Sequence, residues 1–462
     1  MWCTLLCLGR SRWPLRSTAF VGSSGRLLAA AALVLSLQGC ATRDHGLHSV
    51  ERHLASDEPA LALESLERQS KSWSRRDKVL YSLNRAMLLR MQGDLHASNT
   101  AFSKAERRIN ELYGVSVTEQ MGSVVINDRT RSYAGEEFEQ VLLHVYMALN
   151  FLEMRQYDSA RVEALQIDLK LRQFGKRIAK KKYLEDAFAR YLAGLIYEQH
   201  AEWSDAMIEY RKAYEAYREY RLAYGMSMPL ALQENLLRLT HRLGLDEEHR
   251  RYQDEFGLGY AAEPGSSPVP GQLVVLLHNG LAPVKREEAV ILPAPGTHTL
   301  VKVALPYYQS RSAPAKGARL KVGDRVIRLD LVEDVNAVAI RNLEVKMPAI
   351  QARALSRAAI RAAVVEGLRR DDQWLLGLLA ELGGLAIEHA DTRSWITLPY
   401  DIYMGRVSLA PGKYTVKLEV LDRYDAVLAE RQFRDVKIHT QQLTFLSHHW
   451  VVPRHLLFES RR

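Results

Sequence analysis

The hydrophobic pattern of this 462-residue chain changes from a helical period to a strand-like one at the segment Ala261–Gly271 (AAEPGSSPVPG). From about Leu47 to Gly257, apolar residues recur at positions i, i+3, i+4 and i+7, as they do along one face of a helix. Beyond the segment, short apolar runs separated by turn residues are typical of strands. We therefore expect a helical domain over residues 40–260, a linker over 261–271 and a β-rich domain over 272–462.

The helical half contains pairs of helices with a recurring arrangement of small and aromatic residues. Small residues in each pair would let two helices approach closely, and the aromatic rings would fill the gaps between them. The clearest pair is Glu185–Tyr217, with Gly194, Tyr197, Trp203, Ala206, Tyr210 and Ala213. A second pair has Ala148, Phe151, Tyr157, Ala160 and Ala164, and a weaker third has Ala86, Leu89, Gly93, Phe102 and Ala105.

This arrangement resembles the tetratricopeptide repeat (TPR), a helix hairpin that stacks into arrays. A half-match at Pro59, Ala62 and Leu66 and a turn at Gly244 extend the resemblance to both ends of the helical half. The pairs are unevenly spaced, so insertions must interrupt the array, chiefly at Tyr113–Glu136. An ordinary helical bundle is the alternative.

The C-terminal half reads as a mixture of strands and one helical stretch. Met347–Ala390 is largely helical in pattern. The predicted strands are Leu273–Leu277, Leu300–Leu305, Leu320–Val322, Val326–Val332, Arg406–Leu409, Tyr414–Val420 and Phe433–Ile438. The predicted fold class is therefore α+β multidomain: a TPR-like array followed by a β-sandwich-like domain with a helical insertion.

Residues 1–40 have the layout of a secretory signal. Four arginines precede an uncharged run of 11 residues, Leu27–Leu37, which is too short to cross a bilayer as a helix. The sequence Leu37-Gln38-Gly39-Cys40 resembles the lipobox of bacterial lipoproteins. The resemblance implies a signal peptide over residues 1–39, cleavage before Cys40 and lipidation of its thiol. A plain signal peptide with an incidental cysteine is the alternative.

Composition after the predicted cleavage supports an exported protein. Cys3 and Cys7 leave with the signal, so no disulfide can form within the mature chain, which must be stabilised by its core. Ala41 stands where an Asp would resemble an inner-membrane retention signal, which favours the outer membrane, facing the periplasm. The mature chain keeps 59 basic against 54 acidic residues. This small excess does not indicate a nucleic-acid partner; anionic lipid or cell-wall polymer would fit better.

A tyrosine and arginine stripe is the candidate partner-binding site. Tyr210, Tyr214, Tyr217 and Tyr224 share one helix face, and arginines adjoin them. Tyr and Arg are enriched at protein interfaces, and many phenol oxygens on one helix are hard to satisfy in a core. The predicted site comprises Tyr210, Tyr214, Tyr217, Arg218, Arg221 and Tyr224. Core packing between neighbouring repeats is the alternative.

Three further segments allow a structural and a functional interpretation. The basic run from Lys170 to Lys182 is either a solvated helix end or a contact for lipid phosphates. Trp374–Ala390 is nearly all apolar and is either a core helix or a hairpin apposed to a membrane or partner. Asp391 and Arg393 are expected to form an ion pair that fixes a loop, with Trp395 as its apolar anchor.

The sequence carries no recognisable catalytic or cofactor motif: H-E-x-x-H, the Walker loop and G-x-S-x-G are all missing. His448 and His449 give only a weak metal signal, because adjacent residues on a strand point to opposite faces. We therefore expect no cofactor, no metal and no enzymatic activity. A glycan hydrolase remains the less favoured alternative, because such enzymes need little more than two carboxylates across a cleft.

Three segments together resemble a family of uncharacterised bacterial lipoproteins with TPR-like N-terminal halves. They are Tyr133–Glu139 (YAGEEFE), His278–Arg286 (HNGLAPVKR) and Asp391–Trp395 (DTRSW) with Leu398-Pro399. The resemblance implies architecture and location but no activity. The leading hypothesis is an outer-membrane-anchored scaffold or regulator of cell-envelope biogenesis, with a concave helical groove for a protein partner. A module that binds peptidoglycan or another glycan, or anionic lipid, is the alternative.

Overall fold

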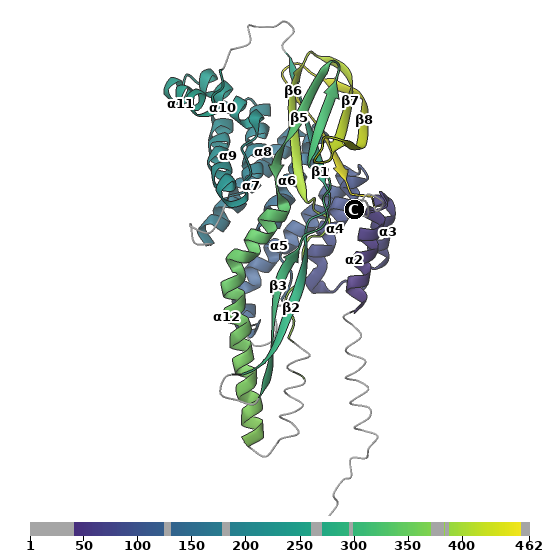
Figure 1. Ribbon diagram of the computed structural model, residues 1–462, viewed down its shortest axis with the longest axis vertical. Coiled ribbons are helices and arrows are strands. Elements are labelled where there is room, and N and C mark those ends of the chain that lie inside the picture. Colours follow the sequence, from purple (N-terminus) through teal and green to yellow (C-terminus); the bar gives the residue numbers. More distant parts are fainter. Residues whose placement is uncertain are drawn as a thin grey trace, which may run out of the picture. The chain divides into compact units, whose positions relative to one another are not determined.

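The computed structural model describes residues 41–123, 131–177, 185–259, 270–294, 299–370, 383 and 388–453 (Figure 1). Cys40 and the predicted signal lie outside these residues, as does nearly all of the predicted linker Ala261–Gly271. Lipidation and the domain boundary therefore stay predictions. From Ser49 onward, the chain forms one compact unit that contains both the helices and the sheet.

The first half of the chain is an array of helix hairpins. The helices are α2 (Ala41–Leu54), α3 (Pro59–Arg68), α4 (Lys78–Met91), α5 (Leu95–Ser123), α6 (Glu137–Glu153), α7 (Tyr157–Arg177), α8 (Ala187–Gln199), α9 (Trp203–Tyr224), α10 (Leu230–Arg242) and α11 (Asp246–Phe256), with a short 3₁₀ turn at Arg75–Asp77. Consecutive helices from α3 to α11 contact one another, so each hairpin packs on the next. This is the TPR-like arrangement that the sequence predicts.

The hairpin α8–α9 shows why these residues form closely packed helices. A Cβ atom at Gly194 would overlap the ring of Tyr210, so only glycine allows the two helices to approach this closely. Ala206 and Ala213 on α9 are fully buried as well. The carboxylate of Asp186 accepts a hydrogen bond from the backbone N–H of Ala189 (2.7 Å) and caps α8. The predicted roles of these small residues are confirmed.

The second half is built around one sheet of seven strands. The strands are β1 (Gly271–Asn279), β4 (Gly317–Val322), β5 (Arg325–Glu333), β6 (Asp401–Leu409), β7 (Gly412–Leu421), β8 (Val427–Ile438) and β9 (Leu443–Trp450). Their order is β8-β7-β4-β5-β6-β1-β9, antiparallel throughout except for the parallel pair β1–β9.

The sheet curls so that its two outermost strands, β8 and β9, contact each other. Leu273, Leu320, Leu418 and Ile438, from four different strands, are buried together in its core. The expected sandwich of two sheets is therefore replaced by a single curled sheet that encloses its own core. The seven predicted strands are present, but the pattern missed β2 and β9.

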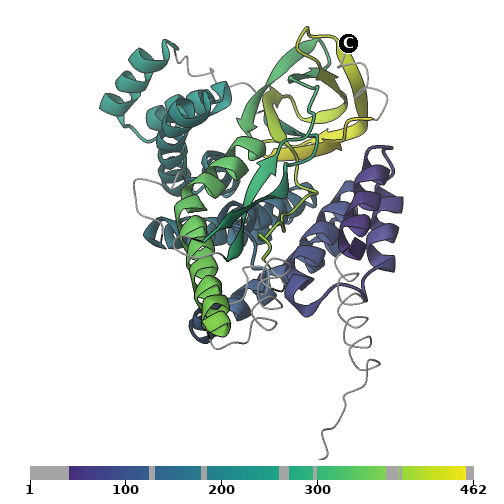
Figure 2. The ribbon, with the colours of Figure 1, turned by 60° about the horizontal axis from the view of Figure 1, so that its bottom comes forward.

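A hairpin and a long helix extend from the sheet (Figures 1 and 2). Strands β2 (Val284–Pro293) and β3 (Leu300–Gln309) pair with each other, and α12 (Val335–Arg370) lies along β3. Ala294 and Val301 pack against Ala358 and Ala362 of α12. The helix begins at Val335, earlier than the predicted Met347. Among the described residues, no helix has the length and apolar character needed to cross a membrane.

Candidate functional site

Three of the six residues predicted to bind a partner lie in the protein interior. Tyr210 and Tyr217 are 0% and 1% exposed, and Tyr214 is also buried. Each phenol oxygen has a partner within the chain: Glu198 Oε2 for Tyr210 (2.6 Å), Glu255 for Tyr214 (2.8 Å) and the carbonyl of Val332 for Tyr217 (2.9 Å). Burial therefore leaves no hydrogen bond unmade. The predicted tyrosine surface is corrected to core packing.

The other three predicted residues lie near the end of α9. Tyr224 is half-buried, and its ring packs edge-on against Tyr220. Arg218 and Arg221 are exposed, and the Arg218 guanidinium lies 5.6 Å from the centre of the Tyr214 ring. The six residues thus do not form one accessible surface.

The face of the array that was expected to hold a partner is covered by the chain's own sheet. Tyr146 on α6 contacts His278 Nδ1 on β1 (3.2 Å). Arg406 on β6 donates a hydrogen bond to Glu198 on α8 (2.6 Å). The side chain of Gln199 accepts the backbone N–H of Leu443 on β9 (2.6 Å). Because α6 and α8 are buried under these strands, they offer no open groove to another protein.

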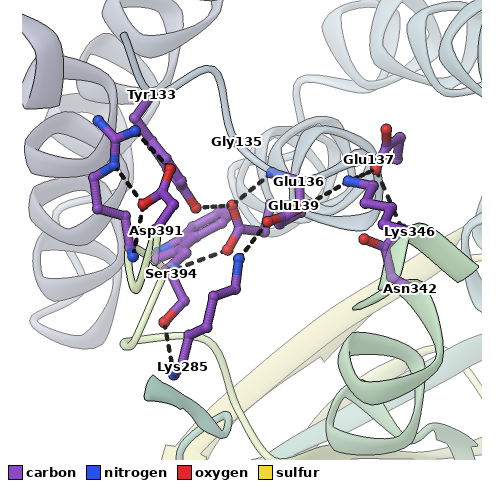
Figure 3. A network of polar contacts seen from close by, with 12 residues as sticks. Tyr133, Gly135, Glu136, Glu137, Glu139, Lys285, Asn342, Lys346, Asp391 and Ser394 are labelled. Atoms are coloured by element: carbon purple, nitrogen blue, oxygen red, sulfur yellow. Dashed lines mark hydrogen bonds and ion pairs between the residues drawn. The ribbon is translucent and has the colours of Figure 1, made fainter. Parts of the chain in front are cut away.

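The three segments that carry the family resemblance meet in one polar network (Figure 3). Its centre is the start of α6, where Glu139 accepts a hydrogen bond from the backbone N–H of Glu136 (2.9 Å). Glu139 also accepts the backbone N–H of Trp395 (2.8 Å) and the hydroxyl of Tyr133. Burial and the neighbouring Glu136 raise the pKa of Glu139. One carboxylate thus joins Tyr133–Glu139 to Asp391–Trp395, two segments that are far apart in the sequence.

Glu136 binds two lysines from the second half of the chain (Figure 3). Lys285 on β2 and Lys346 on α12 both donate to its carboxylate, and Lys346 also pairs with Glu137. Burial alone would raise the pKa of Glu136, but the two ammonium groups outweigh it and lower that pKa. The pKa of Lys285 is raised because Glu136 outweighs the effect of burial. These pairs tie α12 and the β2–β3 hairpin to the array.

Arg393 completes the network on its other side. It forms the predicted ion pair with Asp391 (2.6 Å) and also binds Asp77 (3.2 Å) and the carbonyl of Arg131 (2.9 Å). Trp395 is buried, and its indole N–H donates to Thr397 (3.0 Å). The predicted pair and its apolar anchor are both confirmed.

The chemistry of this network is that of a cross-link between distant elements. The carboxylate of Glu136 and the ammonium groups of Lys285 and Lys346 neutralise one another in ion pairs that join the start of α6 to β2 and α12. Sequence reasoning marked Tyr133–Glu139, Lys285 and Asp391–Trp395 through the family resemblance. It missed Lys346, whose helix carries no local signal of a partner some two hundred residues earlier.

The remaining sequence candidates contribute less. Lys170 is buried, and residues 178–184 of the basic run lie outside the described residues, as does most of Trp374–Ala390. His449 Nε2 binds the carbonyl of Gly280 (2.9 Å), and burial lowers the pKa of both His448 and His449 to about 4. Within the described ranges, no group of three or more potential ligands is placed to hold a metal ion.

Comparison with known proteins gives weak structural likenesses only. No protein-family model matches the chain, and no curated protein matches it in sequence. MamA 41-end from Desulfovibrio magneticus RS-1 is 15% identical over 46% of this chain and 90% of its own, with a TM-score of 0.30. A tetratricopeptide repeat protein from Parabacteroides merdae ATCC 43184 is 11% identical over 47% and 80%, with a TM-score of 0.21. At these values the likeness carries no argument about function.

Proposed function

We propose that this protein is a lipid-anchored scaffold of the bacterial cell envelope, and that it binds a partner protein through the outer face of α12. The observation that carries the proposal is a helix with two apolar faces, of which the chain covers only one. The covered face contains Ala354, Ala358, Ala362 and Val365. The uncovered face contains Ala352, Leu355, Ala359, Ile360, Ala363 and Val364.

A helix that is apolar on both sides is normally buried on both sides. Leu355, Ile360 and Val364 are 57%, 42% and 55% exposed, and Val290 and Ile291 of the neighbouring hairpin are exposed as well. Exposed apolar side chains gathered on one helix face are typical of a binding site. The network around Glu136 holds the helix in place, so the surface is presented from a fixed position.

The expected occupant is a helix of another protein. Alanines alternate with branched side chains along the uncovered face, which lets a second helix approach closely and interdigitate. A lipid surface is less well matched, because helices that lie on membranes carry aromatic residues on the apolar face, and the exposed positions from Gln351 to Val364 include none.

The proposed location depends on Cys40. Several acyl chains on this thiol would anchor the protein firmly, because each buried CH₂ contributes about 0.8 kcal/mol. Cys40→Ser should release the protein from the membrane fraction without changing its unfolding temperature, since the compact unit begins only at Ser49. A mutant that still fractionates with outer membranes would contradict the lipoprotein proposal.

The interaction is tested by photo-crosslinking in cells from a reactive residue placed at Ser356, on the uncovered face of α12. A matched probe at Leu222, which is 90% exposed on α9, is the control. We expect one dominant protein adduct from position 356 and none from 222. The identified partner is then purified, and its affinity is measured for the wild type and for Ile360→Asp with Val364→Asp. About tenfold weakening or more is expected, because two hydrophobic contacts are lost.

Two outcomes would overturn the scaffold proposal. One is the same adduct pattern from both positions, and the other is an unchanged affinity in a double variant that remains folded. Binding to purified cell wall or to anionic vesicles without any protein adduct would favour the glycan- or lipid-binding alternative instead.

A further inference from the structure

The two outermost strands of the curled sheet leave a gap between them. Strands β8 and β9 stand at opposite ends of the strand order, yet they contact each other in space. The hydroxyl of Thr444 on β9 lies 3.3 Å from the carbonyl of Lys437 on β8. No strand ladder joins β8 to β9 in the described part of the chain, so each has one edge without a neighbouring strand. Such an edge can pair with an additional strand.

Two adjoining pockets follow this gap. One has a volume of about 390 Å³ and lies between the ends of α4 and α6 and strands β1, β8 and β9. The other has a volume of about 450 Å³ and is lined by β8, β9 and the end of α6. The two share Glu153, Arg431 and Phe433. Together they form one groove along β8.

The groove carries excess positive charge. Arg155, Arg431, Arg434 and Lys437 line it. Arg155 donates to His439 (2.6 Å) and to the carbonyl of Lys437, and Arg431 lies over the ring of Phe433. In the described part of the chain, these four cations form no ion pair with a carboxylate. The ion pair between β8 and its neighbour β7 joins Glu430 to Lys417 instead.

The acidic residues of the groove do not balance this charge. Glu153 already binds Arg90 and accepts a hydrogen bond from Ser447 (2.8 Å). The others are Asp57 and Asp435. Apolar side chains, namely Leu152, Phe433, Phe445 and Leu446, also line the groove, and of these Phe433 and Leu446 are partly exposed. The groove thus offers both cations for carboxylates and apolar surface for apolar side chains.

We infer that this groove binds an extended acidic peptide segment of a partner protein, which adds as a strand to the free edge of β8. The inference rests on the proposed scaffold function and gives it a second docking surface. Backbone N–H and C=O groups on a strand edge can form a hydrogen-bond ladder with another polypeptide, whereas a lipid headgroup or a glycan cannot.

An irregularity in the β7–β8 pairing limits how much of β8 can bind the peptide. It lies at Asp435, which has φ +55°, and it bends the strand. The peptide therefore pairs with the residues of β8 before Asp435.

The experiment selects 12-residue peptides from a random displayed library on the full-length protein in detergent. We expect the enriched peptides to carry Asp or Glu alternating with apolar residues. The best peptide is synthesised, and its affinity is measured for the wild type, for Arg431→Glu with Arg434→Glu, and for the control Arg218→Glu on α9. The double variant should bind at least about tenfold more weakly, and the control should match the wild type. Hydrogen exchange should show protection of the β8 amides around Arg431–Arg434.

Three results would overturn the inference: enriched peptides without an acidic bias, an unchanged affinity in the folded double variant, or protection that falls outside β8 and β9. Binding of phosphatidylglycerol vesicles that requires Arg431 and Arg434, with no peptide selected, would assign the groove to lipid instead. The α12 variant Ile360→Asp with Val364→Asp must leave peptide binding unchanged. Failure of the groove is thereby distinguished from failure of the α12 surface.

Discussion

At the scale of single residues, Asp401 shows how burial couples this fold to pH. Its carboxylate accepts a hydrogen bond from Asn279 (2.7 Å) and lies 3.4 Å from the hydroxyl of Tyr403. Burial raises the pKa of Asp401 from 3.8 to about 7. Between these two values the folded state binds more protons than the unfolded state. The contribution of Asp401 to stability is therefore complete below about pH 4 and is lost as the pH rises through 7.

We predict that Asp401→Asn stabilises the protein at pH 8 but not at pH 4. The amide keeps the contacts to Asn279 and Tyr403 and cannot ionise. The gain at pH 8 should be on the order of 4 kcal/mol, since the pKa is raised by about three units and each unit corresponds to about 1.4 kcal/mol. Urea unfolding at both pH values measures it. The exposed Asp254→Asn is the control, and an equal gain at pH 4 and pH 8 would exclude a titration effect.

Lys285 provides a second residue-scale prediction with the opposite dependence on pH. Its side chain is 4% exposed and pairs with Glu136, whose lowered pKa makes the pair stabilising above about pH 4.5 and lost as the pH falls. Lys285→Met should destabilise the protein by about 3 kcal/mol at pH 7, because it removes one partner of a buried pair. The control Lys417→Met breaks an exposed pair with Glu430 and should cost less than about 1 kcal/mol. An equal loss of unfolding free energy in both variants would show that the buried network adds no more stability than an exposed pair.

At the scale of elements, the contact between α8 and α9 depends on a missing side chain. Gly194→Ala should separate the two helices and destabilise the protein by about 2 kcal/mol, because the new methyl group overlaps the Tyr210 ring. Gly367→Ala on α12 is the matched control, since no atom lies within 4 Å of its Cβ position. That variant should be neutral or more stable by up to about 1 kcal/mol, because alanine favours the helix. Thermal unfolding of both variants measures the difference, and equal unfolding temperatures would contradict the prediction.

The helix pairs could be predicted from the sequence, whereas two of the strands could not. The hairpin array was predictable because small and aromatic residues such as Gly194 and Tyr210 repeat at local spacings. Strand β2 was missed because the charged run that begins at Lys285 breaks the apolar pattern, and β9 because His448 and His449 do the same. Lys285 is nevertheless buried, since Glu136 compensates its charge from 149 residues away. Local patterns carry no record of such a distant partner.

The candidate surfaces illustrate the same limit. Tyrosines at helical spacing give the same sequence pattern whether their face meets solvent or packs against another element. The buried hydroxyls of the α9 tyrosines have acceptors on three different elements, namely Glu198 on α8, Glu255 on α11 and the carbonyl of Val332 on β5, which no local pattern places beside them. The exposure of one apolar face of α12 could not be predicted either, because the sequence shows that a helix is apolar but not which of its sides the rest of the chain covers.

At the scale of the whole molecule, the array and the sheet depend on each other for burial. We predict that residues 41–259 expressed alone will aggregate, since α6 and α8 would expose the faces that the strands cover. Co-expression with residues 270–462 as a separate chain should restore a soluble complex that co-purifies. A monomeric, soluble fragment 41–259 with a cooperative unfolding transition would show instead that the array is an independent domain.

The position of β9 has a consequence for how the protein is made. This strand lies parallel to β1 and supplies contacts to the array, including the bond between Leu443 and Gln199, which are 244 residues apart. Contacts of such long range form late and slow the search for the native state. During synthesis, the apolar sides of α6 and α8 therefore stay uncovered until β9, near the end of the chain, has been made. We expect that interval to be the chain's most aggregation-prone period. A stop codon just before Leu443, which removes β9 and 20 of the 462 residues, should therefore cause aggregation of the whole chain.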